Sequence, residues 1–297
     1  MLLLFVVIGV VLRQHPKVKT PFKSIVDKTV KLSLERSSSK VQFEKKGDQW
    51  IVSSGPGMTS YPADSLRMVR FTDSLRDFSV GDLISERKDR LAEFGIDESS
   101  RVHLQLADTS GKTLEQGYFG RMASDRTQMY FQYADQKGVF LATNIEPLAS
   151  DVAFWRVTTI FAFPEPQISK IVIEAPGFKS ELDRVQESSG PVEAIWTCNK
   201  KPADLAAVRK VVSAIAFIQS DGFADMPPDA VDAAKLTFAT IRLTVKDGEH
   251  VLHVGALDAK RGMYPVKADD APASYWLART KIDALLVKPA MLTSQKK

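Results

Sequence analysis

The sequence predicts an α+β, sheet-rich protein made of two homologous modules, and three observations support the prediction. Short segments in which apolar and polar residues alternate recur along the chain, and this pattern is typical of half-buried β-strands. In each half, one longer segment has apolar residues at three- and four-residue spacing, which is typical of an amphipathic helix. The patterns of the first half return in the second half in the same order. Each module is therefore expected to contain an antiparallel meander, a capped helix and a second meander.

The repeat is clearest between residues 91–142 and residues 236–278. Four landmarks return in the same order and at nearly unchanged spacing: Leu114 as Leu252, Gly117 as Gly255, Met129 as Met263 and Leu141 as Leu277. Because the spacing changes by only a few residues, we attribute the differences to loop length. The repeat therefore predicts a duplicated packing unit.

Residues 29–150 form the predicted module one. Alternating apolar residues between Val30 and Val52 indicate three short strands. Asp64 is placed to cap a helix that ends near Phe78, and a helical turn at residues 88–94 is closed by Gly95. The helix should bury one apolar face: Met68, Phe71, Leu75 and Phe78. Four further strands are expected at about residues 101–107, 112–119, 127–133 and 138–142.

Residues 168–290 form the predicted module two. Trp196 takes the place of Trp50, and Asp204 takes the place of Asp64 at the start of the helix. Between the modules, residues 151–167 are rich in aromatic residues and proline, and we expect this linker to pack down at the module interface. Residues 291–297 are expected to be a frayed tail.

Residues 1–12 contain an apolar run that resembles nothing else in the chain. Its eleven apolar residues would span about 16 Å as a helix, against about 30 Å of membrane hydrocarbon. No basic segment precedes the run, and no small-x-small cleavage site follows it. We interpret residues 1–12 as a truncated membrane anchor, with a buried N-terminal strand or helix as the alternative.

Residues 13–28 follow the anchor and are polar, with prolines at positions 16 and 21, so they are interpreted as a stalk. Basic residues stand directly after the apolar run: Arg13, Lys17 and Lys19. On the positive-inside rule alone, these residues favour a cytoplasmic body.

Composition limits the classes of function. The 40 basic and 36 acidic side chains are interspersed, which is typical of a solvated surface and argues against a nucleic-acid partner. The single cysteine, Cys198, excludes an intramolecular disulfide. Gly-Pro-Gly at residues 55–57 predicts a turn rather than a phosphate-binding loop, because proline lacks a backbone N–H group.

Few residues could carry out catalysis or bind a metal. His250 and His253 are three positions apart on a predicted strand, so they should face opposite sides of the sheet and cannot share an ion. His103 is expected on a polar strand face, either solvated or paired with a side chain. Cys198 precedes the polar residues 199–201, which could lower the thiol pKa, but no histidine is near it in sequence. We therefore assign no catalytic residue, cofactor or metal ligand.

Aromatic residues at repeated positions supply the remaining candidates. Trp50 and Trp196 are expected to be core anchors, because a duplication preserves packing. Tyr130 and Tyr264 stand at equivalent strand positions and could instead line a groove between the modules, together with the linker residue Trp155. These two tyrosines and Trp155 are the candidate binding-groove residues.

The order of the landmarks resembles the domain of unknown function 4340 family. The motifs that carry the resemblance are Gly-x-x-Trp-x-Val at residues 47–52, Ala-Asp at 63–64, Phe-Gly-Ile at 94–96 and Leu-x-x-Gly at 114–117. The resemblance implies an extracytoplasmic body that is held to a bacterial inner membrane. It also implies genes for an ABC-type transporter and its auxiliary component nearby, as in gliding-motility-type export systems. It provides no catalytic residues.

The sequence therefore leads to the hypothesis of a non-catalytic, membrane-anchored periplasmic protein that acts as a scaffold or accessory component of an ABC-type transporter. Its expected partners are the membrane and a transporter protein. Two alternatives remain: a module that binds envelope glycan or peptide in an inter-module cleft, and a hydrolase. A deep pocket with converging polar groups would favour a ligand, whereas a flat, exposed apolar patch would favour a protein partner.

Overall fold

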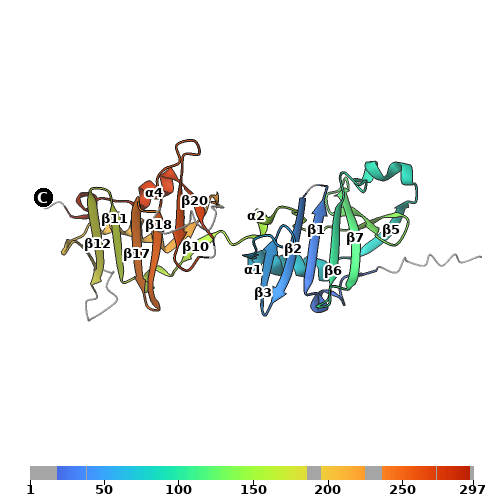
Figure 1. The fold of residues 1–297 in the computed structure, drawn as a ribbon, viewed down its shortest axis with the longest axis horizontal. Helices are drawn as coiled ribbons and strands as arrows, with labels where there is room; N and C mark the ends of the chain where they lie inside the picture. Colours follow the sequence, from blue (N-terminus) through green and yellow to red (C-terminus); the bar gives the residue numbers. More distant parts are fainter. Residues whose placement is uncertain (1–18, 38, 186–194, 225–235, 272, 295–297) are drawn as a thin grey trace, which may run out of the picture. The chain divides into compact units, whose positions relative to one another are not determined.

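The computed structural model describes residues 19–37, 39–185, 195–224, 236–271 and 273–294 (Figure 1). The chain divides into two compact units, Met1–Arg156 and Val157–Lys297, which are called unit 1 and unit 2 below. Each unit contains one large antiparallel sheet, so the prediction of a sheet-rich α+β fold is confirmed. Among the described residues, none of the helices has the length and apolar character needed to span a membrane. The predicted anchor at residues 1–12 lies outside those residues.

Unit 1 is built on a nine-stranded sheet with the order β4-β3-β2-β1-β6-β7-β8-β9-β5. Its strands are β1 (Lys31–Arg36), β2 (Ser39–Lys46), β3 (Gln49–Ser53), β4 (Tyr61–Pro62), β5 (Val80–Ser85), β6 (Val102–Ala107), β7 (Thr113–Met122), β8 (Gln128–Tyr133) and β9 (Val139–Thr143). Its helices are the 3-10 helices η1 (Val26–Lys28) and η2 (Lys88–Phe94) and the α-helices α1 (Ser65–Asp77) and α2 (Val152–Trp155).

Unit 2 contains a second nine-stranded sheet with the order β14-β13-β12-β11-β17-β18-β19-β20-β16. Its strands are β11 (Lys170–Ala175), β12 (Phe178–Val185), β13 (Ile195–Cys198), β14 (Lys201–Pro202), β16 (Gly222–Phe223), β17 (Ala239–Val245), β18 (Gly248–Val254), β19 (Met263–Ala268) and β20 (Tyr275–Ala278). A separate pair joins β10 (Thr159–Ala162) to β15 (Phe217–Gln219). The helices are η3 (Glu165–Gln167), α3 (Leu205–Ala216), α4 (Arg279–Leu285) and α5 (Pro289–Leu292).

The two sheets correspond strand by strand in their order. Trp50 lies in β3 and Trp196 lies in the equivalent strand β13. Asp64 and Asp204 cap the equivalent helices α1 and α3, and each carboxylate accepts a hydrogen bond from a first-turn backbone N–H group. The residues paired by the sequence repeat therefore occupy the same topological positions.

Each capped helix covers one face of its sheet with the apolar residues that the spacing predicted. In α1 these are Met68, Phe71 and Leu75, all fully buried or nearly so, and Phe78 is buried directly after the helix. In α3, Val208, Val211 and Ile215 are buried in the same way. The helix is amphipathic because its other faces carry charged residues, which stay in solvent.

The interpretation of residues 13–28 as a stalk is wrong for residues 19–28, which belong to the fold of unit 1. Lys19 forms a backbone bridge with Val80, and Phe22 is 0% exposed. The centroid of the Phe22 ring lies 5.3 Å from that of Phe78, and the rings of Phe119 and Phe131 are also neighbours. The apolar residues at positions 22, 25 and 26 have helical spacing, but the polar residues between them made the segment resemble a solvated stalk.

The start of the predicted linker and the start of the predicted frayed tail contain equivalent short helices, α2 and the end of α5. In unit 1, α2 ends at Trp155, whose carbonyl oxygen accepts a 2.7 Å hydrogen bond from the backbone N–H of Asp64. In unit 2, α5 ends at Leu292, whose carbonyl oxygen accepts the equivalent 2.9 Å bond from Asp204. Both side chains are 0% exposed. The frayed-tail prediction is therefore wrong up to residue 294, because this short helix closes the core beside the helix cap.

Candidate functional site

The motifs that carry the family resemblance have structural roles in this fold. Gly117 of the Leu-x-x-Gly motif lies in β7 beneath the ring of Phe131, and an added Cβ atom would approach that ring to 2.4 Å. Gly255 is its counterpart in unit 2, where a Cβ would meet Leu236 at 2.7 Å and Pro265 at 2.8 Å. The repeated glycine is therefore required for the close approach of neighbouring side chains.

The Phe-Gly-Ile motif fastens the segment of residues 80–96, which we call the lobe, to the sheet. Gly95 adopts a left-handed conformation with φ of 66° and ends η2. Phe94 and Ile96 are buried with Val139 in a small core of their own. The Phe94 carbonyl lies so close to Gly120 of β7 that a Cβ there would approach it to 2.2 Å. The lobe is thus held on the sheet by tight packing.

The candidate groove residues all have aromatic neighbours in the structure. The Tyr130 ring in β8 lies 4.8 Å from Phe94, and the Tyr264 ring in β19 lies 5.6 Å from Phe238. Tyr264 is only 8% exposed. Trp155 is completely buried in the core of unit 1, where its indole N–H donates a 2.8 Å hydrogen bond to the Ala149 carbonyl. These residues pack against their own units, and Trp155 presents no surface to a ligand.

The lobe carries an exposed apolar pair that sequence analysis did not select. The lobe begins with β5, one of the two edge strands of the unit 1 sheet, which pairs irregularly with β9. Leu83 is 49% exposed and Ile84 is 42% exposed. In Figure 1, the helical turn that follows β5 stands out from the end of the sheet. Exposed apolar residues on an edge strand are unusual, because edges are normally protected from pairing with other chains.

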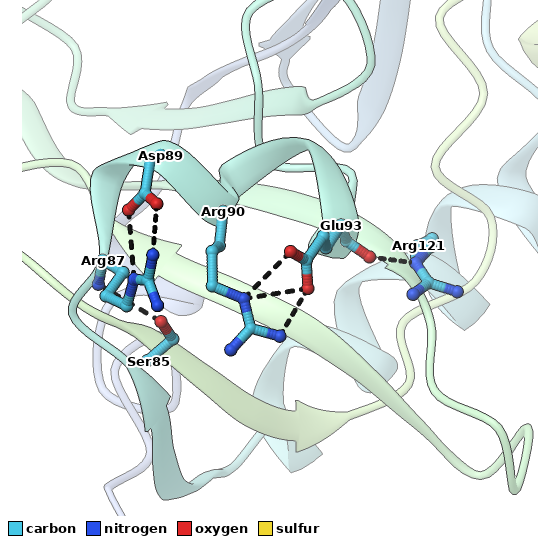
Figure 2. Close-up of polar contacts among 6 residues, drawn as sticks. All are labelled: Ser85, Arg87, Asp89, Arg90, Glu93 and Arg121. Atoms are coloured by element: carbon cyan, nitrogen blue, oxygen red, sulfur yellow. Dashed lines mark hydrogen bonds and ion pairs between the residues drawn. The ribbon is translucent and has the colours of Figure 1, made fainter.

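Ion pairs within η2 and its flanks tie the lobe together, as Figure 2 shows. The Arg87 Nε atom lies 3.2 Å from Asp89 Oδ1, and Arg90 Nε lies 2.9 Å from both carboxylate oxygens of Glu93. Arg121 of β7 donates a hydrogen bond from Nε to the Glu93 carbonyl oxygen, which joins the helix to the sheet. The lobe therefore presents Leu83 and Ile84 beside a helical turn in which two arginines are each paired with a carboxylate.

The altered pKa values in this network have a structural cause. Hydrogen bonds from Arg87 lower the pKa of Asp89, and hydrogen bonds from Arg90 lower the pKa of Glu93. The pKa of Arg90 is raised in return by its bond to Glu93. Each shift favours the charged form of a side chain that keeps solvent contact, so the network stays ionised rather than storing a proton for catalysis.

A hollow of about 330 Å³ lies between the lobe and the turn that joins β8 to β9. Lys88 and Leu91 line it from the lobe, and Tyr133 and Lys137 line it from the strands and their turn. The Tyr133 hydroxyl is buried and makes no hydrogen bond among the described residues. Burial raises the pKa of Tyr133, with Glu115 and Asp135 adding to the shift, so this phenol stays neutral at physiological pH.

The remaining reactive side chains are placed as follows. Cys198 is buried, and burial raises the pKa of its thiol, so the expectation that its polar neighbours could lower this pKa is wrong. His250 and His253 face opposite sides of β18, as their spacing predicted: His250 lies opposite the buried Leu243 in the β-ladder, and His253 lies opposite the partly exposed Thr240.

Each histidine has a separate partner. The His250 Nδ1 atom lies 3.0 Å from Asp270, and the His253 Nε2 atom lies 2.8 Å from Asp269. His103 is paired with Gln116 at 3.2 Å, and burial lowers its pKa. Within the described ranges, no three His, Cys, Asp or Glu side chains form a group that could hold a metal ion.

A comparison with protein-family models shows which family the chain belongs to. The family model described as "Domain of unknown function (DUF4340)" matches residues 50–201, just over half of the chain. The chain belongs to this family. No curated protein and no solved structure matches it. The DUF4340 match begins at Trp50 of β3 and ends at β14, so it includes the whole lobe and the packing glycines Gly95 and Gly117, but not Gly255.

Proposed function

We propose that this DUF4340 protein is a non-catalytic, membrane-tethered accessory component of an ABC-type transport or export system. Its body would lie on the extracytoplasmic side of a bacterial inner membrane. Two features support this proposal: the apolar run at residues 2–12, which is the candidate tether, and membership of the DUF4340 family, for which we expect transporter genes nearby.

The observation that carries the proposal is the exposed apolar pair on the lobe. Leu83 and Ile84 lie on an edge strand, so a partner can contact both their side chains and the backbone groups of β5. The ion pairs of η2 and the packing of Phe94 fix the lobe before a partner arrives, which lowers the entropy cost of association. We infer that a protein subunit of the transporter docks here.

Co-purification tests the proposed docking. The affinity-tagged full chain is expressed in its native host, and the ABC-type transporter subunits that co-purify with it are quantified. Leu83→Asp should reduce their recovery about tenfold or more, because it places a charge in an apolar contact. Val69→Asp is the matched control, since Val69 is 54% exposed on α1 of the same unit. Equal recovery with Leu83→Asp and with wild type would refute docking at the lobe.

The alternatives that the sequence left open gain no support from the candidate groove residues. Tyr130 and Tyr264 are each packed against an aromatic ring, and Trp155 is a core residue. A hydrolase that uses Cys198 as its nucleophile is disfavoured, because a buried thiol with a raised pKa is a poor source of thiolate.

A further inference from the structure

A row of uncharged polar side chains crosses the outer face of the unit 1 sheet, opposite the face that α1 covers. Strand pairing places Ser53 beside Gln42, Gln42 beside Ser33, and Ser33 beside Gln105. Partner residues in a β-ladder point to the same side, so these four side chains form one continuous row over β3, β2, β1 and β6. All four are partly exposed.

Most of the row has unused hydrogen-bonding capacity. The side chains of Ser33, Gln42 and Ser53 make no hydrogen bond to any other described residue. The side-chain amide of Gln105 donates one hydrogen bond to the Thr113 hydroxyl, so the side-chain carbonyl oxygen of Gln105 remains available. Hydroxyl and amide groups each offer both donors and acceptors. The row can therefore satisfy both kinds of backbone group in a ligand.

Unit 2 provides an internal comparison, because its sheet has the same strand order and therefore has positions equivalent to those of the row in unit 1. Val172 takes the place of Ser33, Glu181 that of Gln42, and Arg242 that of Gln105. Glu181 is paired with Lys170, and Arg242 lies 2.8 Å from Glu174. In unit 2 the two charged residues of this row are thus paired within the unit and flank an apolar valine, whereas in unit 1 the row is neutral and open. Fold stability does not require the unit 1 arrangement.

The open row forms the floor of a groove of about 470 Å³. One wall is the turn at residues 55–57, after which Met58 is 61% exposed, and the other is the β6–β7 turn at Gly111. Ile51 adds a partly buried aliphatic surface. Lys31 and Glu44 stand opposite each other on the rim, and their charges are opposite in sign. The groove therefore has no excess of either charge.

We propose that this groove binds an uncharged, extended segment of a partner protein. The floor spans three inter-strand spacings, about 14 Å, which matches about four extended residues. Its amides and hydroxyls can pair with peptide N–H and C=O groups, while Met58 and Ile51 can accept apolar side chains of varied shape. The exposed side chains that line the groove include no aromatic ring, so it lacks the flat surface that a sugar ring would stack on.

A peptide array tests the proposal with the full chain in mild detergent. The probes are acetylated, amidated octapeptides of Ser, Asn, Thr, Val, Leu and Met, the same peptides with two positions replaced by Asp or by Lys, and an N-acetylglucosamine pentamer. Fluorescence anisotropy then measures the Kd of the uncharged peptides that bind. The first variant is Gln42→Glu, which introduces the residue of unit 2 at this position. The second is Ser33→Lys, and the control is Val172→Lys at the equivalent position of unit 2.

We expect the uncharged peptides to bind, Gln42→Glu and Ser33→Lys each to raise their Kd about tenfold, and Val172→Lys to leave it unchanged. Urea unfolding confirms that each variant is folded. The proposal is overturned if no uncharged peptide binds, if both groove variants bind as wild type does, or if the charged peptides bind equally well. It is also overturned if the sugar pentamer binds to the wild-type protein but not to the Gln42→Glu variant. The groove and the lobe use different residues, so failure of lobe docking leaves this inference intact.

Discussion

At the scale of single residues, the family motifs are explained by packing. Gly117 and Gly255 make room for a side chain of the neighbouring strand, and Gly95 supplies the left-handed turn that ends η2. A motif built for close packing predicts the fold well but says little about function. The residues that we assign to binding, Leu83 and the Ser33–Gln42 pair, lie outside these motifs.

Because Gly117 is closely packed, adding a single methyl group at this position should destabilise the fold. Gly117→Ala should lower the free energy of unfolding by about 1–3 kcal/mol, because the new Cβ overlaps the Phe131 ring in a core that cannot give way freely. Gly222→Ala is the control, since its Cβ would meet its nearest neighbour, in Trp276, at an ordinary 3.8 Å. Urea unfolding measures both. A Gly117→Ala variant as stable as wild type would show that the motif glycine has another purpose.

The buried thiol of Cys198 predicts a pH dependence of stability. Because burial raises its folded pKa above the unfolded value, the unfolded chain loses this proton first as the pH rises. The free energy of unfolding should therefore fall as the pH rises through and above the ordinary thiol pKa, about 8.5. Urea unfolding between pH 7 and pH 10 should show this fall in wild type and a smaller one in Cys198→Ala. Identical pH profiles for the two proteins would contradict the assignment.

At the scale of elements, the capped helix is the part that the sequence described best. The apolar spacing of residues 64–78 predicted which side chains face the sheet, and Asp64 predicted where the helix begins. The short closing helices were harder to predict. Trp155 and Leu292 share little as side chains, yet α2 and α5 close their units in the same way through a carbonyl bonded to the helix-capping residue. Their equivalence lies in backbone hydrogen bonds, which leave no sequence signature.

The burial of the α1 face predicts different costs for neighbouring substitutions. Phe71→Ala should lower the free energy of unfolding by about 3–5 kcal/mol, because the ring is 0% exposed and its loss leaves a cavity. Arg70→Ala should change it by less than about 0.5 kcal/mol, since this residue lies on the exposed face. Thermal and urea unfolding measure both. If Phe71→Ala were as stable as wild type but failed to bind a partner, α1 would be a docking face.

At the scale of the whole molecule, two units share one strand order but differ at the surface. Unit 1 presents the exposed lobe and the neutral row on its outer sheet face, whereas the matching row of unit 2 is occupied by its own ion pairs. A duplicated fold allows one copy to retain a stable surface while the other acquires a binding surface. This division is the physical basis for placing both proposed contacts on unit 1.

The proposed tether predicts where the molecule resides. The full-length protein, expressed from its native start, should be recovered with membranes, and a chain that starts at Pro16 should be recovered in the soluble fraction. The shorter chain keeps Lys19 and Phe22, so it retains the contacts that complete unit 1. Cell fractionation followed by immunoblotting measures the distribution, and circular dichroism checks that the shorter chain is folded. Recovery of both chains in the soluble fraction would contradict the anchor.

The sequence by itself determined the sheet-rich class, the repeat, the helix caps and the buried face of α1, because these depend on local spacing and on short-range hydrogen bonds. Only the tertiary structure decided the roles of Phe22 and Leu292, the burial of Cys198 and the aromatic neighbours of Tyr130 and Tyr264. It also decided which polar side chains meet, since Ser53, Ser33 and Gln105 come together only through strand register. Contacts between residues far apart in the chain depend on how the strands pair, and one sequence does not encode that pairing locally.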